Sequence, residues 1–243
     1  MLPTNPKTNP VFQRLTRHPN APLTLQETAL LAGGLGFLVL TIRLSKMSVS
    51  LLLTPWYFEI AAWLLYPFAP LIGATMAASI TGRDASTDLH QLMRQTPVAR
   101  TDIVWGYIFT TFYRLRALLA LMVALLPALL FGGVLGIPYI FPHPGIRLVL
   151  AIGLWGAILF GVVVGVSEGL LHKKVFPGVV AAPFGVTVIL VPLAFTGRSL
   201  FYLLSEFPMA GATLGFVVIM SILIVWSPYL LSLLFFRLAS RWA

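Results

Sequence analysis

Between two long apolar runs of this chain lies the polar sequence RDASTDLHQLMRQTPVARTD, residues 83–102, which we call the island. The chain of 243 residues is 58% hydrophobic and only 9% charged, yet eight of its charged residues fall between Arg83 and Arg116. Charged side chains avoid apolar surroundings unless they are paired. The island therefore predicts a segment that lies outside the apolar part of the molecule and contacts another molecule.

Apolar runs recur along the whole chain on both sides of the island, and the mean hydropathy is +0.93. This composition excludes a soluble domain or a disordered chain and predicts a protein that crosses a membrane several times. Inside hydrocarbon every backbone amide needs a partner within the protein, so the runs must be helices or strands of a closed barrel. Runs of about 20 residues rich in Leu, Ala and Gly favour helices, and the sequence predicts an all-α polytopic membrane protein.

Six transmembrane helices are predicted, at residues 24–42, 56–80, 105–131, 146–171, 175–195 and 212–236. Residues 1–23 are then a cytoplasmic N-terminal arm. Residues 24–243 form one six-helix transmembrane domain, whose cytoplasmic segment 81–104 contains the island. Pro67 and Pro70 should bend the second helix, because proline has no backbone N–H and clashes with the preceding turn.

The distribution of basic residues supports this topology. Twelve Lys and Arg residues fall on the cytoplasmic side, and only Arg43, Lys46, Arg147 and Arg198 fall outside. Loops that stay in the cytoplasm carry an excess of Lys and Arg, so the bias predicts a multi-pass protein of the plasma membrane with both termini inside. Because membrane topology accounts for the basic residues, the net charge of +9 does not indicate a nucleic-acid partner.

The fourth predicted helix has a small residue at every fourth position, a series that we call the ladder: Gly153, Ala157, Gly161, Gly165 and Gly169. Positions four apart lie on one face of a helix, so this face has almost no side chains. Helices in lipid associate through van der Waals contact, and small residues let their backbones approach closely. The ladder therefore predicts close packing on another helix of the same chain or, as the alternative, of a second copy.

The third predicted helix is longer than a membrane requires. Residues 102–131 correspond to about 45 Å of helix, against a hydrocarbon core of about 30 Å. About ten residues at its start should therefore lie in the cytoplasm or among the lipid headgroups. Arg114 and Arg116 belong to this helix, and we expect both side chains to reach the inner membrane surface. Contact with a transported substrate is the alternative.

Several kinds of chemistry lack their residues in this sequence. No lysine follows a glycine as in a nucleotide-binding P-loop, and no His-Glu-x-x-His zinc pattern occurs. The four histidines fall in loops or at helix ends, where they would not ligate a haem inside the membrane. Residues 165–169 match the Gly-x-Ser-x-Gly hydrolase pattern, but that pattern needs a strand-to-helix turn and here lies inside the ladder. We expect no catalytic residue, no metal, no cofactor and no enzymatic activity of this chain itself.

Motifs in the arm and the island resemble those of a known family. The sequence NPVFQRLTR, residues 9–17, predicts a short amphipathic helix with Asn9 as its N-cap. In the island, Arg83-Asp84 precedes a helix-forming stretch at residues 87–93, then Thr96-Pro97, then the sequence IVWG at residues 103–106. With six predicted spans, this plan resembles the permease subunits of ATP-binding-cassette exporters of the second permease class (ABC type 2). In that family Lys is usual at the position of Tyr107, and Glu at the position of Asp84.

The resemblance implies a function and a set of contact residues. The chain would be the membrane subunit of an exporter, paired with a second copy or a related permease and driven by a separate ATP-binding-cassette ATPase subunit. The island helix would be the coupling helix that sits in a groove of that ATPase, with residues 9–17 as an interface helix beside it. The implied ATPase contacts are Arg14, Arg17, Arg83, Asp84, Thr87, Asp88, Leu89, Gln91, Leu92, Met93, Arg94, Thr96, Pro97 and Arg100.

Two alternatives remain open on the sequence alone. Residues 199–208 resemble the short outward-facing re-entrant helix of such permeases, with a plain interfacial helix as the alternative. A different class of function, a structural or assembly subunit of another membrane complex, is equally compatible with spans that carry no charge near the membrane centre. An ATPase encoded beside this chain would favour the exporter.

Overall fold

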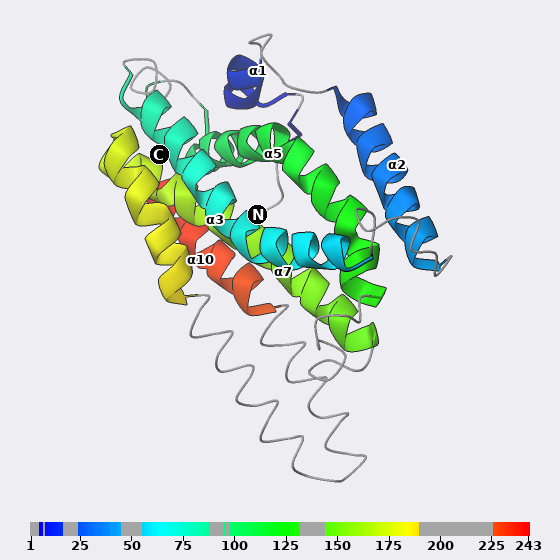
Figure 1. Cartoon of the computed structure of the whole chain (residues 1–243). Coiled ribbons are helices and arrows are strands. Elements are labelled where there is room, and N and C mark those ends of the chain that lie inside the picture. The colour runs from blue at the N-terminus through cyan, green and yellow to red at the C-terminus, as the bar shows by residue number, and fades with distance from the viewer. Residues whose placement is uncertain are drawn as a thin grey trace.

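The computed structural model describes residues 5, 6, 8–16, 24–44, 55–87, 95, 98–131, 144–189 and 226–243. Within these residues the regular elements are all helices, and no strand occurs. The helices labelled in Figure 1 are α1 (Pro10–Thr16), α2 (Leu25–Leu44), α3 (Pro55–Ala85), α5 (Arg100–Phe131), α7 (Pro144–His172) and α10 (Ser227–Trp242). A further helix, Val175–Ile189, follows α7 and is drawn in yellow.

Three described helices are long and apolar enough to cross a membrane: Tyr57–Ala85 in α3, Arg100–Ala128 in α5 and Ile152–His172 in α7. Two shorter apolar helices accompany them. Large apolar side chains lie on the outside of these helices, and Phe37 and Phe176 are 72% and 80% exposed. Soluble proteins do not leave extended apolar surfaces in water. The chain is therefore an all-helical membrane protein, which confirms the sequence-based prediction of class.

The centre of the molecule is the contact between α3 and α7. A Cβ added to Gly161 would lie 2.3 Å from the Pro70 carbonyl oxygen, and one added to Gly165 would lie 2.2 Å from the Ala74 carbonyl oxygen. Only glycine permits backbones to approach this closely. The contacts advance in the same direction along both helices, so α3 and α7 run parallel. The ladder thus faces a helix of its own chain.

On another side, α10 packs against α7 and runs parallel to it. The Tyr229 ring lies against Gly156, and further along both helices the Ser167 hydroxyl donates to the Phe235 carbonyl oxygen at 3.1 Å. The rings of Phe160 and Phe235 meet edge to face between these two contacts, with centroids 5.6 Å apart. Three helices, α3, α7 and α10, therefore point the same way.

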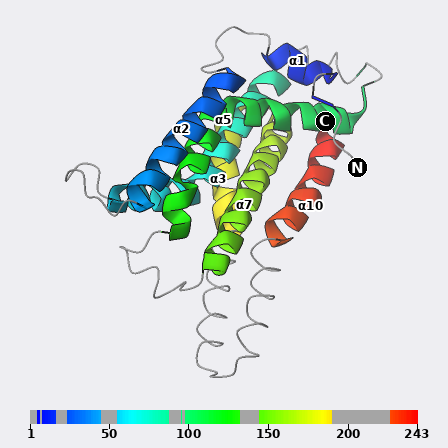
Figure 2. The same cartoon turned by 90° about the vertical axis from the view of Figure 1, so that its right-hand side faces the viewer.

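The direction of α5 is opposite to that of α3. The Tyr66 hydroxyl of α3 donates to the Met122 carbonyl oxygen at 2.8 Å, while Asp84 at the end of α3 meets Tyr107 near the start of α5. The end of α3 and the start of α5 consequently lie at one end of the molecule, together with α1 and the C-terminus (Figures 1 and 2). The sequence-based topology expects these two helix ends on the same side of the membrane.

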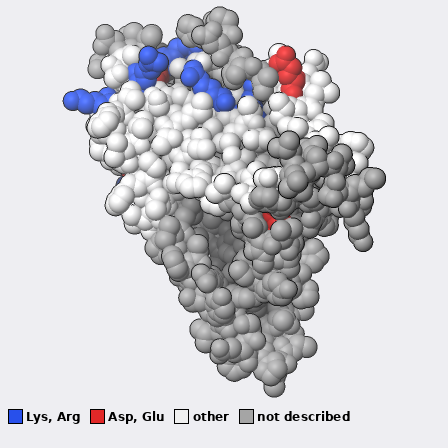
Figure 3. All heavy atoms as spheres, in the orientation of Figure 1, with Lys and Arg blue, Asp and Glu red and all other residues white. Residues whose placement is uncertain are grey.

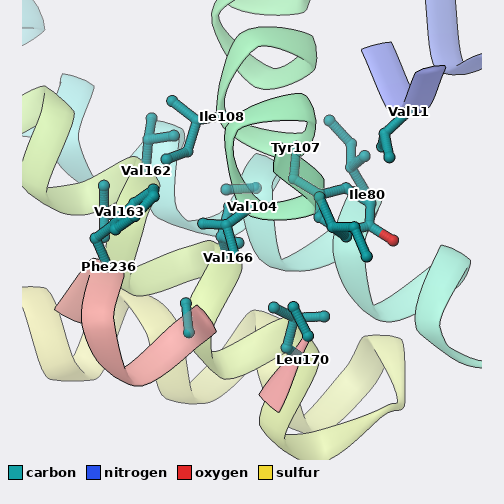
Figure 4. Packing of buried hydrophobic residues seen from close by; sticks show 14 of the residues in the cluster. Val11, Ile80, Val104, Tyr107, Ile108, Val162, Val163, Val166, Leu170 and Phe236 are labelled. Atoms are coloured by element: carbon teal, nitrogen blue, oxygen red, sulfur yellow. The ribbon is translucent and has the colours of Figure 1, made fainter. Parts of the chain in front are cut away.

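A cluster of buried apolar side chains joins these helices near that end (Figure 4). Val11 of α1 belongs to the cluster and is fully buried, with Ile80 of α3 and Tyr107 of α5 beside it. A helix of seven residues is too short to be stable alone, because its few internal hydrogen bonds do not offset the cost of nucleation. The helical state of α1 therefore depends on its packing against the rest of the protein.

Some predicted boundaries change in the structure. Helix α5 begins at Arg100, earlier than the predicted span, and its first part runs across the end of the bundle before the rest descends along it (Figures 1 and 2). Helix α3 continues through Pro67 and Pro70 and bends along its length in Figure 1. Outside the described residues lie the re-entrant helix expected at 199–208 and residues 212–225 of the sixth predicted span.

Candidate functional site

Helix α1 begins with a side-chain cap, as the sequence predicts. Asn9 Oδ1 accepts hydrogen bonds from the backbone N–H groups of Val11 and Phe12 at 3.0 and 3.1 Å. Pro10 occupies the first helical position, where its missing N–H leaves no donor unpaired. Asn9 is buried, and its Nδ2 donates to the Asp102 carbonyl oxygen at 2.7 Å. The same side chain thus starts α1 and joins it to the first turn of α5.

Arg14 joins α1 to the end of α3. Its guanidinium donates to Asp84 Oδ2, and the Tyr107 hydroxyl of α5 donates to the same oxygen at 2.5 Å. The Asp84 side chain is only 10% exposed, so both contacts form largely away from water, where hydrogen bonds to a charged group are strongest. One carboxylate therefore links three helices, and we call Arg14, Asp84 and Tyr107 the clamp.

Gly106 of α5 provides the surface on which α1 lies. A Cβ at this position would lie 2.5 Å from the Val11 Cβ and 2.6 Å from Asn9 Oδ1. Beside it, the Phe12 ring packs edge-on against the Tyr113 ring, with centroids 5.8 Å apart. Any side chain at Gly106 would separate α1 from α5, so this glycine is required for the docked position of α1.

The clamp places α1 between the two ends of the island. Asp84 belongs to the last turn of α3, where the island begins, and Asp102 belongs to the first turn of α5, where it ends. Arg83, Thr87 and Arg100 are exposed at the end of α3 and the start of α5, and Lys and Arg side chains gather at this end of the molecule in Figure 3. We call α1 and these three exposed residues the docking surface. Its positive charge favours a partner with an acidic surface.

The C-terminal helix also contacts the start of α5. The Arg100 guanidinium donates to the Arg241 carbonyl oxygen at 3.5 Å, and the rings of Trp105 and Phe236 have centroids 5.0 Å apart. The first turns of α5 thus touch α1, α3 and α10 at once. A displacement of this part of α5 would therefore be passed to all three helices.

The structure describes some of the residues that the family resemblance implies. Arg14 and Asp84 pair with each other inside the chain, whereas Arg83, Thr87 and Arg100 are exposed. The remaining implied contacts lie outside the described residues: Arg17, Asp88, Leu89, Gln91, Leu92, Met93, Arg94, Thr96 and Pro97. All members of the ladder are buried in α7: Gly153, Ala157, Gly161, Gly165 and Gly169.

The role of Tyr107 was not predicted from the sequence. Tyr107 and Asp84 stand there as two separate departures from the family pattern, Tyr for Lys and Asp for Glu. In the structure the Tyr107 hydroxyl donates to the Asp84 carboxylate, so the two residues that differ from the family pattern are hydrogen-bonded to each other. A signal was present in the sequence, because a hydroxyl can donate to a carboxylate as an ammonium group does.

The two arginines in the middle of α5 differ from each other. Arg114 is exposed, whereas Arg116 is only 6% exposed. The Arg116 Cζ lies 4.2 Å from the centroid of the Tyr113 ring, so the ring covers one face of the guanidinium. The expectation that both side chains reach the inner membrane surface stays a prediction, and the structure adds that Arg116 is enclosed by the protein whereas Arg114 is not.

No family model matches the chain, and no curated protein or solved structure matches it. Among the described residues, no three His, Asp or Glu side chains lie close enough together to hold a metal ion. The described residues at this end of the molecule form a short helix that contacts Asp84 and Asp102, and the basic side chains of Arg83 and Arg100 are exposed there. These features suit the binding of another macromolecule.

Breaking the clamp should loosen α1. In Arg14→Gln, the Asp84 carboxylate retains only the hydrogen bond from the Tyr107 hydroxyl. In Asp84→Asn, the hydrogen bonds from Arg14 and Tyr107 lose the negatively charged acceptor that strengthens them. Each variant should lower the free energy of unfolding by about 1.5 kcal/mol, the lower end for hydrogen bonds to charged groups, because Arg14 remains 29% exposed. Thermal unfolding of the purified protein in detergent measures this loss.

A double-mutant cycle provides the control for the clamp. The variant that carries both Arg14→Gln and Asp84→Asn should lose little more stability than Asp84→Asn alone, since both substitutions remove the same contact. Strictly additive losses would show that the two residues act independently and that the clamp is not a functional pair.

Proposed function

We propose that this chain is the membrane subunit of an ATP-binding-cassette exporter. In this proposal it crosses the plasma membrane as six helices and pairs with a second copy or a related permease. A separate ATPase subunit binds its cytoplasmic side and supplies the energy for transport. The proposal is supported by the plan of arm, island and apolar helices, which resembles permeases of the second class, and by the contacts that α1 makes.

The observation that carries the proposal is the position of α1 between the two ends of the island. Asp84 and Asp102 bound the segment in which the coupling helix is expected, and α1 contacts both, through Arg14 and Asn9. A coupling helix must be held firmly at both ends if the motion of an ATPase is to move the transmembrane helices. The clamp contacts one end of this segment and the Asn9–Asp102 hydrogen bond contacts the other, and in this proposal α1 is the interface helix.

Force applied to the island has a direct route into the membrane. It reaches α3 at Asp84 and α5 at Asp102, and α3 lies backbone against backbone on α7. Close-packed helices move as rigid bodies rather than by continuous deformation. Closure of two ATPase subunits would therefore tilt α3 and α7 together, and two such halves would alternate between inward and outward openings.

The orientation of the protein follows from its charges in this proposal. Arg83 lies in the last turn of α3 and Arg241 in the last turn of α10, where the Arg100 guanidinium contacts the Arg241 carbonyl oxygen. Basic residues are retained on the cytoplasmic side of membrane proteins. The docking surface would thus face the compartment that contains ATP, with both termini of the chain on the same side.

Affinity purification in mild detergent tests the proposal. The tagged wild-type protein should copurify with an ATPase that carries a P-loop, and a tagged multi-pass protein of unrelated function from the same membrane should not. If the wild-type chain brings down a complex that contains no ATPase, the exporter proposal fails and a structural or assembly subunit becomes the better reading.

A further inference from the structure

The turn between α7 and the helix Val175–Ile189 holds a lysine in a strained backbone conformation. Helix α7 ends at His172, and Lys173 has a φ of 51°, in the left-handed region. Within the described part of the chain, no other residue except glycine has a positive φ. Glycine usually fills this position after a helix, because a Cβ there crowds the following carbonyl oxygen. Such strain is kept where it serves a function, and here the lysine side chain is what glycine would lack.

Close backbone contacts fix the position of this turn. The Lys173 N–H donates to the Gly169 carbonyl oxygen at 3.1 Å, which closes the last turn of α7. A Cβ added to Gly82 of α3 would lie 2.9 Å from the Lys174 carbonyl oxygen and 3.2 Å from the Val175 Cα. Only a residue without a side chain lets the turn lie this close to α3. The backbone that carries both lysines is therefore held by α7 and by α3.

Neither Lys173 nor Lys174 has an acidic partner among the described residues. Both side chains are exposed, and the ion pairs described are the one in the clamp and the one between His172 and Glu168. Glu168 is the acidic residue of α7, and its Oε2 lies 3.3 Å from the Nε2 of His172. The positive charge of the turn is thus available to a ligand.

Large apolar side chains are exposed on both sides of the two lysines. Leu171 is 46% exposed and Phe176 is 80% exposed. Phe176 follows Lys174 by two residues, about 3 Å along a helix axis. It begins a row of exposed apolar side chains at every fourth position of the helix: Phe176, Val180, Phe184 and Val188. In a membrane protein such a row lies in hydrocarbon, so the lysines lie at its boundary, at the level of the lipid headgroups.

We propose that Lys173 and Lys174 bind the headgroup of one anionic phospholipid. Each ammonium group donates charge-assisted hydrogen bonds to phosphate oxygens, while its methylene stem stays against apolar surface. An acidic protein surface would match the charge but would leave Phe176 uncovered, whereas a phospholipid offers phosphate and hydrocarbon side by side. Basic residues at the membrane surface attract anionic lipids. The inference goes beyond the exporter proposal, because it depends on neither an ATPase nor a cargo.

Lipid binding to the purified, delipidated protein tests this proposal. Phosphatidylglycerol or phosphatidylcholine is added in detergent, and bound lipid is measured by native mass spectrometry. The wild type should hold the first phosphatidylglycerol about tenfold more tightly than phosphatidylcholine, because two lysines favour an anionic headgroup. The variant with both Lys173→Gln and Lys174→Gln should lose this preference. The variant with both Lys173→Arg and Lys174→Arg keeps the charge and should keep the preference.

A matched control removes two positive charges elsewhere on the protein. Arg100 and Arg241 are both exposed, and the variant with Arg100→Gln and Arg241→Gln should keep the preference for phosphatidylglycerol. The melting temperature without lipid checks that each variant is folded. Inorganic phosphate should not displace bound phosphatidylglycerol. An unchanged preference in the variant with both lysines replaced by Gln, an equal loss in the arginine control, or displacement by inorganic phosphate would overturn the proposal.

Lys173→Gly separates the side chain from the backbone strain. Glycine adopts the left-handed conformation freely, so this variant should melt at a higher temperature than the wild type when no lipid is present. It should also lose about threefold of the preference for phosphatidylglycerol, the share of one of the two lysines. A lower melting temperature without lipid, together with an unchanged lipid preference, would show that the Lys173 side chain stabilises the fold itself, and the proposed lipid site would be wrong.

Discussion

Gly165→Leu should separate α7 from α3 and destabilise the whole transmembrane domain. The added Cβ alone would lie 2.2 Å from the Ala74 carbonyl oxygen and 2.8 Å from the Ala77 Cβ. These are backbone and near-backbone atoms of a packed helix, which cannot rotate away as the end of a flexible side chain can. The helices must move apart, and dispersion contacts along the interface are lost with them.

The expected cost of Gly165→Leu is about 3 kcal/mol or more, the upper range for overpacking in a close-packed core. Its measure is the melting temperature of the purified protein in detergent. Gly34→Leu on α2 is a matched control, because a Cβ added at Gly34 lies within 4 Å of no described atom outside its own helix backbone. That control should melt like the wild type. Wild-type stability of Gly165→Leu would contradict the close contact of α7 with α3.

Leu92→Asp should abolish association with the proposed ATPase subunit while leaving the protein folded in the membrane. Leu89, Leu92 and Met93 are spaced as one apolar face of the island helix that the sequence predicts. In the proposed complex this face enters a groove of the ATPase, and buried apolar anchors carry most of the binding energy of such contacts. A carboxylate without a partner in that groove costs several kcal/mol, which corresponds to a loss of association of about a hundredfold or more.

The measurements for Leu92→Asp are copurification of the ATPase and ATP-dependent transport, with expression and melting temperature as controls for folding. Gln95→Asp introduces the same charge at an exposed position of the island and should retain the ATPase. If Leu92→Asp associated fully with the ATPase, the island helix would not be the coupling helix. If Leu92→Asp and Gln95→Asp lost the ATPase equally, the loss would come from the added negative charge and not from the removal of a leucine that inserts into the groove.

The sequence predicts the class of the molecule and part of its packing. Hydrophobic run length predicts membrane helices, and the spacing of Gly161 and Gly165 predicts a bare face on α7, because both signals are local. The sequence does not predict which helix packs against this face of α7. The partner surface on α3 consists of the carbonyl oxygens of Pro70 and Ala74, which any sequence could supply. The run of small residues around Ala74, Ala77 and Ala78 was the available signal.

The clamp shows why the candidate site could be predicted only in part. The sequence places Arg83 and Asp84 together in the island as charged residues for a partner. Adjacent residues on a helix point in directions about 100° apart, so Arg83 is exposed while Asp84 turns inward to Arg14. Whether each side chain faces solvent or protein depends on where α1 docks. The docked position of α1 depends in turn on Gly106 and on the packing of α5. Contacts between residues so far apart in the chain produce no signal in the local periodicity of the sequence.

Helix α1 is synthesised before every residue that it contacts in the rest of the protein. Asp84 follows Arg14 by 70 residues, and Asp102 follows Asn9 by 93. A seven-residue helix does not persist alone, so the arm has no stable structure to adopt while the ribosome is still making α3. It can close onto the bundle only after the start of α5 has emerged. Helix α1 can therefore dock only after α2, α3 and the start of α5 have been made.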